Sequence, residues 1–141
     1  MMSRLLWLVD EDTEAFNKIM AVFAMPKSTD EEKAARAAAM QEATLYATQV
    51  PLETIKATMD TFPLIRAMAE EGNPNSVSDA GVGALAARAA VLGACLNVKI
   101  NAGGLKDREV HILHPITDAL SEVHSIIWTG FWELCMNFIV R

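Results

Sequence analysis

Apolar residues recur every three or four positions along most of the chain, which is the spacing of one face of an α-helix. In residues 3–25 seven apolar positions keep this spacing, and Pro26 ends the segment. These positions are Leu5, Leu8, Val9, Phe16, Ile19, Met20 and Phe23. The alternation typical of a β-strand is absent from residues 3–71. We therefore predict that an amphipathic helix opens the chain.

A second helix is predicted to start at residue 30, because Thr29 can cap it and Glu32, three positions later, completes a capping-box pattern. Residues 30–49 are rich in Ala, Glu and Lys, which are strong helix formers. Pro51 lacks the backbone N–H that a helix interior needs. The sequence therefore predicts a break or kink near Val50.

A third helix is predicted over residues 51–71, with a proline in its first turn, a bend at Pro63 and Gly72 as its C-cap. Residues 72–78 follow as the sharpest break in the chain, since every residue except Val77 is a turn former or a helix cap. Loops of this kind often carry functional side chains.

The fourth predicted helix covers residues 79–98 and carries small residues at three- and four-residue spacing, which lets helix backbones approach closely. These small residues are Ala80, Gly83, Ala84, Ala87, Ala90, Gly93 and Ala94. Asp79 and Arg88 interrupt the pattern, and the uninterrupted apolar run 89–96 is far shorter than the ~20 residues of a membrane span. We expect a tightly packed helix of a soluble protein and no membrane insertion.

Composition narrows the class of protein. The 141 residues are 52% hydrophobic and 21% charged, which predicts one folded domain over 1–141 and excludes a disordered chain. A net charge of −6 makes nucleic acid an unsuitable partner. Cys95 and Cys135 lie in apolar surroundings without paired spacing, so we predict neither a disulfide framework nor a zinc site and expect a cytoplasmic protein.

The tail, residues 109–141, differs from the rest of the chain in being poor in charge and nearly all apolar from 125 to 140. It holds His111, His114, His124, Trp128 and Trp132. A proline directly after the second histidine breaks the helix that a metal-binding pair at this spacing needs, so no metal site is predicted.

Several sequence blocks then occur in a fixed order within residues 8–108. The most specific are 72–79 (GNPNSVSD) and 96–101 (LNVKIN). Supporting blocks are 8–12 with Ala15, Phe16 and Asn17, then Pro26 and Lys27, and 31–33 with Ala35 and Arg36. Together they resemble the cyclodeaminase/cyclohydrolase family, the helical folate enzymes that include the C-terminal domain of formiminotransferase-cyclodeaminase.

The resemblance implies an all-α fold, an antiparallel bundle of long, proline-kinked helices that forms a homodimer and binds a tetrahydrofolate, without a metal. The implied reaction is cyclodeamination, in which 5-formiminotetrahydrofolate closes to 5,10-methenyltetrahydrofolate and ammonia leaves. Hydrolysis of the methenyl ring, and a non-catalytic role in assembly, remain alternatives. A separate glutamate formiminotransferase chain is a further candidate partner.

The resemblance also suggests site residues. Asp79 is the first candidate for proton transfer if partial burial raises its pKa, whereas a first-turn acid stabilised by the helix dipole is the alternative. Asp12, in an acidic run, is a second catalytic candidate. The candidates for binding the substrate are polar residues at the two ends of the fourth helix, Asn73, Asn75, Ser76, Ser78, Asn97, Lys99 and Asn101.

Two departures from the family pattern accompany the match. Relatives usually begin some tens of residues earlier, so we expect this chain to lack an N-terminal part of the domain. The tail after Arg108 does not align with the charged helix that the family has there. The family-like region is therefore 8–108, and 109–141 is a divergent apolar tail.

Overall fold

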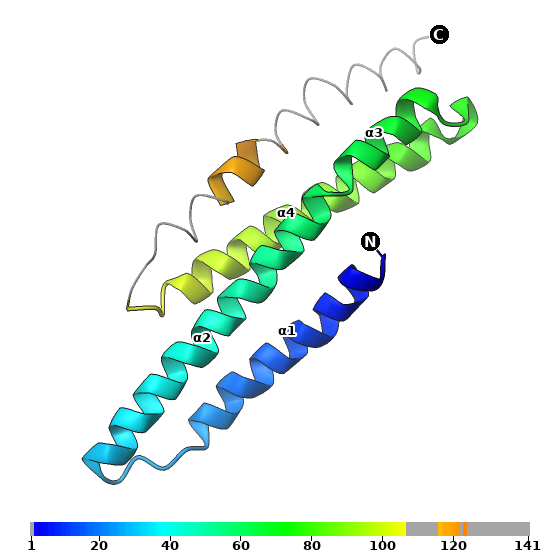
Figure 1. The fold of residues 1–141 in the computed structure, drawn as a ribbon. Helices are drawn as coiled ribbons and strands as arrows, with labels where there is room; N and C mark the ends of the chain where they lie inside the picture. The colour runs from blue at the N-terminus through cyan, green and yellow to red at the C-terminus, as the bar shows by residue number, and fades with distance from the viewer. Residues whose placement is uncertain (1, 107–115, 122, 124–141) are drawn as a thin grey trace.

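The chain folds into long α-helices in a computed structural model, which describes residues 2–106, 116–121 and 123 (Figure 1). The elements are α1 (Met2–Phe23), α2 (Asp30–Met59), α3 (Phe62–Glu71), a 3-10 turn η1 (Pro74–Ser76) and α4 (Val77–Ala102). No strand occurs among these residues, which confirms the all-α prediction. The tail residues singled out above, His111, His114, His124, Trp128, Trp132 and Cys135, lie outside the described residues.

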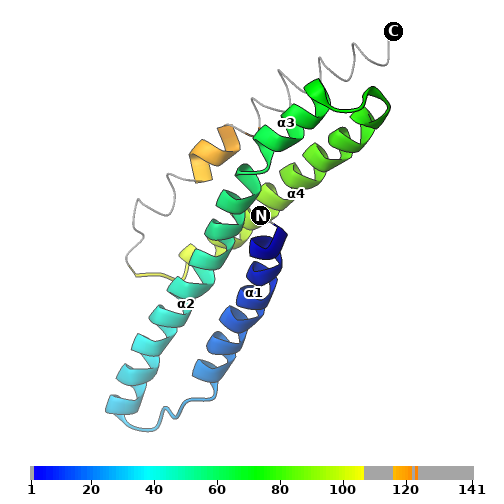
Figure 2. The same cartoon turned by 45° about the vertical axis from the view of Figure 1, so that its right-hand side comes forward.

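α2 is the central element of the bundle. α1 runs antiparallel to α2 along most of its length, so that Arg4 near the start of α1 pairs with Glu53 of α2 (Figure 1). α4 runs antiparallel to α2 and α3 on another side (Figures 1 and 2). Two apolar clusters result: one joins α1 to α2 around Leu8 and Val50, and the other joins α2, α3 and α4 around Val91 and Val98. Helical residues 116–121 add Ile116 and Ala119 to the second cluster.

The predicted start of α2 is confirmed. The Thr29 hydroxyl accepts a hydrogen bond from the Glu32 backbone N–H at 3.2 Å, and the Glu32 carboxylate accepts one from the Thr29 N–H at 3.1 Å. Arg36, one turn further on, donates through Nε to the Val22 carbonyl of α1 at 3.1 Å. This end of the hairpin is therefore fixed by the cap and by a link between the two helices.

The predicted helix boundary at Pro51 is wrong. α2 continues through Pro51 to Met59, and the break falls at Asp60 and Thr61 instead. Pro51 cannot donate to the Ala47 carbonyl, but Asn101 Nδ2 of α4 donates to that oxygen at 2.7 Å. A tertiary hydrogen bond thus replaces the helical one that proline removes.

Pro63 begins α3 instead of bending a longer helix, since it lies in the first turn, where no N–H donor is needed. Gly72 is the C-cap, as predicted. A Cβ added at Gly72 would lie 2.2 Å from the Met68 carbonyl oxygen, so only glycine fits. α3 therefore turns sharply into η1 and α4.

Among the residues that the structure describes, α4 packs on one face only. Of its predicted small residues, Ala84, Ala87 and Ala94 are buried, whereas Gly83 and Gly93 have no atom within 4 Å of an added Cβ. By length and composition the segment Pro74–Ala102 is apolar enough to cross a membrane, with a mean hydropathy of 1.6 and 33% of the apolar window buried. The predicted close packing therefore holds for the inner face and fails for the outer one.

Candidate functional site

The predicted polar residues at the start of α4 share one exposed turn. Asn73 Oδ1 accepts a hydrogen bond from the Asn75 backbone N–H at 3.0 Å and thereby caps η1. Ser76 is the N-cap of α4 but its hydroxyl makes no capping bond. Asn75 and Ser78 are exposed. The turn thus has several amide and hydroxyl groups, of which only the Asn73 amide oxygen makes a hydrogen bond that holds the shape of the turn.

Asp79 lies in the first turn of α4 and is exposed. The partial burial that a proton donor would need is therefore not found at Asp79 in the described chain. The position suits the alternative, an acid stabilised by the N-terminal end of the helix dipole.

The second predicted cluster lies at the opposite end of α4. Asn97 and Lys99 are exposed, and Asn101 is half-buried because its amide group binds the Ala47 carbonyl. From Asp79 to Asn101 the helix rises about 33 Å, at 1.5 Å per residue. One copy of the chain therefore does not bring the two clusters into a single site.

Asp12 is exposed on α1, and its neighbour Glu11 makes the contact that the sequence did not predict. The Tyr46 hydroxyl of α2 donates a hydrogen bond to the Glu11 carboxylate, and Lys18 Nζ lies 3.7 Å from the centre of the Tyr46 ring. The bond to Glu11 raises the pKa of Tyr46 above its ordinary value of 10.0. A sequence signal was available, since Glu11 and Lys18 are seven positions apart on one helix face.

A groove of about 430 Å³ adjoins this contact between α1 and α2. Its floor is apolar and includes Val22 and Ala43, and its rim carries Lys18, Glu42 and Gln49. The side chains of Glu42 and Gln49 make no hydrogen bond within the described part of the chain. The volume is within the range of small-molecule sites, and the rim has donors and acceptors for a polar ring.

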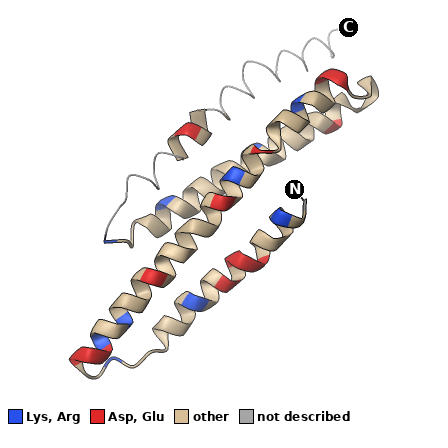
Figure 3. Cartoon of the chain, in the orientation of Figure 1, with Lys and Arg blue, Asp and Glu red and all other residues tan. Residues whose placement is uncertain are grey.

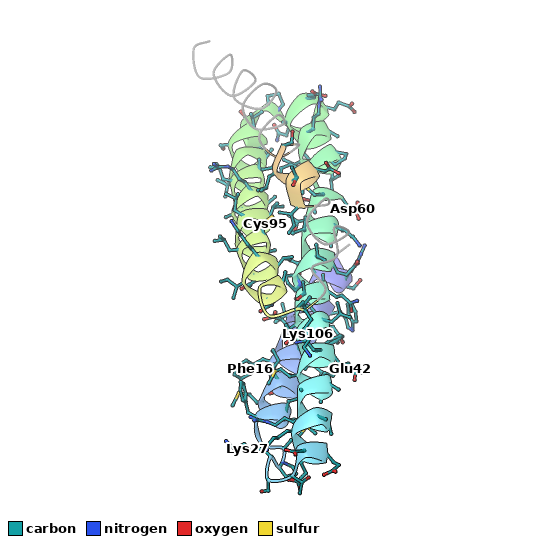
Figure 4. All side chains as sticks on the ribbon, turned by 90° about the vertical axis from the view of Figure 1, so that its left-hand side faces the viewer. Phe16, Lys27, Glu42, Asp60, Cys95 and Lys106 are labelled. Atoms are coloured by element: carbon teal, nitrogen blue, oxygen red, sulfur yellow. The ribbon has the colours of Figure 1, made fainter. Side chains whose placement is uncertain are left out.

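Gln41 holds the C-terminal end of α4 against α2. Its Nε2 donates to the Gly104 carbonyl at 3.1 Å, and its Oε1 accepts from the Lys106 N–H at 2.9 Å. Figure 4 shows Lys106 beside the middle of α2, below Cys95 of α4. This clamp fixes the segment that follows Asn101 against α2.

Charged side chains are distributed unevenly over the helices. Acidic and basic residues gather on α1 and α2, whereas α4 carries only Asp79, Arg88 and Lys99 (Figure 3). No cluster of three metal-binding side chains occurs in the ranges that the structure covers. The arrangement offers hydrogen-bonding amides, hydroxyls and carboxylates for a polar organic ligand.

Comparison with known proteins decides the family. The sequence profile described as formiminotransferase-cyclodeaminase matches residues 1–112, which is most of the chain. The chain belongs to the formiminotransferase-cyclodeaminase family. The match includes α1 to α4 and with them every candidate site residue on the described helices, so the resemblance found in the sequence is confirmed.

Individual relatives of this family member come from bacteria and vertebrates. A methenyltetrahydrofolate cyclohydrolase of Methylorubrum extorquens is 48% identical over 101 residues, which are 72% of this chain and 49% of the relative. Formimidoyltransferase-cyclodeaminases of Gallus gallus and Mus musculus are each 36% identical, over 77% and 85% of this chain but 20% and 23% of their own length. The chain thus spans about half the length of the first relative and less of the others.

Proposed function

We propose that this member of the family acts in folate one-carbon metabolism, on the carbon that bridges N5 and N10 of tetrahydrofolate. The observation that carries the proposal is the family match over residues 1–112, together with relatives named for reactions of this carbon. The exposed amides and carboxylates of α4 and α1 support it, since a pterin ring presents amide and amino groups that such side chains bind.

The reaction that we propose first is cyclodeamination of 5-formiminotetrahydrofolate. N10 adds to the formimino carbon, the amino nitrogen accepts a proton, and the C–N bond to that nitrogen breaks, which releases ammonia and leaves the 5,10-methenyl ring. The chemistry requires a group that moves a proton and groups that orient two nitrogens. Tetrahydrofolate is the carrier of the reacting carbon, and no step needs a metal.

Two carboxylates are proposed to move the proton. Asp79, exposed at the N-terminus of α4, suits accepting a proton from N10 or pairing with the protonated amine. Asp12 on α1 is the second group. The substrate is proposed to bind through the turn residues Asn73, Asn75, Ser76 and Ser78 and through Asn97, Lys99 and Asn101. Because the Asn101 amide NH₂ is already bound to Ala47, its Oδ1 is the atom left for a ligand.

Hydrolysis of the methenyl ring is the second candidate reaction. It is favoured by identity, which is 48% with the cyclohydrolase and 36% with the two cyclodeaminases compared above. Water adds to the bridging carbon, the bond from that carbon to N5 breaks, and the water's proton passes to N5 or to solvent, which leaves a formyl group on N10. Proton-transfer groups beside the same carbon therefore serve this reaction as well. The two reactions differ in which substrate the chain consumes.

The test supplies the purified chain with each substrate in turn. With 5-formiminotetrahydrofolate, cyclodeamination gives equal amounts of ammonia and of the absorbance of 5,10-methenyltetrahydrofolate. With 5,10-methenyltetrahydrofolate, hydrolysis removes that absorbance faster than buffer does. If neither change exceeds the uncatalysed rate, the result favours the third hypothesis, in which the chain is a non-catalytic helical part of an assembly. We place the reaction in the cytoplasm, in a homodimer that can also associate with a glutamate formiminotransferase chain.

A further inference from the structure

A second pocket, of about 290 Å³, lies at the end of the bundle where α1 turns into α2. Half of its lining is basic and half is apolar, from Lys27, Lys33 and Arg36 and from Phe23, Ala37 and Met40. We call it the hairpin pocket. Figure 3 shows the basic segments of the turn and of the start of α2 next to each other. In a chain with a net charge of −6, positive charge is thus concentrated around one small cavity.

The pocket is built from three consecutive parts of the chain. One face of α2 supplies side chains at the i, i+3, i+4 and i+7 positions, from Lys33 to Met40. Lys27 belongs to the turn before α2, and Phe23 is the last residue of α1. The capped start of α2 therefore sets where the cations stand relative to the apolar wall.

Arg36 is held in place without a ligand. Its Nε donates to the Val22 carbonyl at 3.1 Å, and its Nη2 donates to the Phe23 carbonyl at 3.4 Å. The guanidinium carbon lies 5.9 Å from the centre of the Phe23 ring, and the side chain is half-buried. A guanidinium has five N–H donors, so Nη1 and one hydrogen of Nη2 are left for a ligand. A donor that is already fixed loses little entropy when it binds.

The neighbouring carboxylates do not neutralise the hairpin pocket. The Glu32 carboxylate is used by the helix cap. Asp30 pairs with Lys33 at 2.9 Å, but both side chains are exposed, so this pair contributes little and leaves Lys33 two further donors. In the part of the chain that the structure describes, Lys27 and Arg36 have no carboxylate at ion-pair distance. The pocket is therefore suited to an anion from outside the chain.

The number of cations indicates which anion fits. A phosphate monoester carries about −1.5 to −2 charges near pH 7 and has three strong acceptor oxygens. A single carboxylate has one charge and two oxygens, which is too few for three cations. Phe23 is 57% exposed and forms an apolar wall with Met40. This wall suits an aromatic or aliphatic group attached to the phosphate.

We propose that the hairpin pocket binds the phosphate group of a small organic phosphate. Arg36 is the fixed donor, Lys27 and Lys33 supply the remaining charge, and the apolar part of the ligand lies against Phe23. None of these residues is among the candidates for binding the folate, so the pocket is a separate ligand site. A phosphate bound here links the turn to α2 and thereby stabilises the pairing of α1 with α2.

The test is isothermal titration calorimetry of the native chain with phenyl phosphate, which joins a phosphate to an aromatic ring. Saturable binding to one site per chain is expected, and added salt weakens it because the contacts are between charges. Lys27→Gln removes an exposed charge that makes no hydrogen bond within the described chain, and it is expected to weaken binding about tenfold. Arg36→Lys, which loses the fork of donors, is expected to weaken binding at least as much.

The matched control is Lys56→Gln, an exposed lysine near the other end of α2, which is expected to bind phenyl phosphate as the native chain does. Two further ligands identify the chemistry. Phenol lacks the charge, and isophthalate carries two carboxylates on the same ring. Both are expected to bind at least about tenfold more weakly than phenyl phosphate.

Three results overturn the assignment: no saturable binding of phenyl phosphate, equal binding by Lys27→Gln and Lys56→Gln, or isophthalate binding as tightly as phenyl phosphate. Cosedimentation with phosphatidylserine vesicles but not with phosphatidylcholine vesicles, without binding of phenyl phosphate, would assign the basic turn to a membrane surface instead. If Arg36→Lys does not fold, Lys27→Gln decides. None of these readouts needs turnover, so failure of the proposed function leaves them interpretable.

Discussion

At the residue scale, the most informative contact is the one between Asn101 and the Ala47 carbonyl, which lies 54 positions earlier in the chain. The carbonyl has no helical donor because Pro51 occupies the position that would supply it. Asn101→Ala is therefore expected to lower the free energy of unfolding by about 1–3 kcal/mol, the cost of an unpaired buried polar group. Denaturant unfolding followed by circular dichroism measures it.

The control for this prediction is Asn97→Ala, one turn earlier and exposed, which is expected to change stability by less than about 0.5 kcal/mol. The Pro51→Ala background restores a backbone donor, so Asn101→Ala is expected to cost less there. Equal costs in both backgrounds would show that the amide does not compensate for the proline.

Tyr46 gives a second prediction at this scale, because it is the only tyrosine in the chain. Its pKa is raised by the hydrogen bond to Glu11, so tyrosinate absorbance is expected to appear above pH 10.0 in the folded protein. Glu11→Gln removes the negative charge and is expected to move the titration back toward that value. Identical titrations of the native chain and Glu11→Gln would argue against the contact.

The same shift has a consequence for stability. A phenol whose pKa is higher in the folded than in the unfolded state favours folding fully below the unfolded value. This contribution is lost as pH rises from about 10 through the folded pKa. Glu11→Gln is expected to weaken that alkaline loss of stability. Denaturant unfolding of the native chain and of Glu11→Gln, at a series of pH values from about 8 upward, would measure the difference.

At the scale of the element, the start of α2 follows from local sequence and can be tested locally. Thr29→Ala removes the hydroxyl that accepts from Glu32 and is expected to lower stability by about 1 kcal/mol. Ser28→Ala is the matched control, because only the Ser28 backbone contacts Glu32. Thermal unfolding compares them, and an equal effect of the two changes would contradict the capping role.

Helices and caps were predictable because their causes lie within a few residues. The capping box at Thr29 and the C-cap at Gly72 both depend on near neighbours. The continuity of α2 through Pro51 was not predictable, since its cause is Asn101 on another helix. The same limit applies to Gln41, whose partners belong to the segment after α4.

At the scale of the whole molecule, sequence blocks identified the family but not the distance between its polar clusters. Asn73 and Asn101 belong to adjacent blocks along the chain, yet one long helix separates them in space. Burial was likewise unavailable from local sequence, and Asp79 proved exposed. In the proposed homodimer, a site assembled from two copies would bring the two polar clusters together.

Mixing two defective chains tests whether the proposed site is shared between two copies. Asp79→Asn and Asn97→Ala alter opposite ends of α4, and each alone is expected to lose turnover of the one-carbon folate. In an equal mixture, about half of the dimers contain one chain of each variant. Each of these mixed dimers has one intact site out of two, so about a quarter of native activity is expected to return. No recovery, with native chain active and both variants folded, would contradict a site shared between two copies.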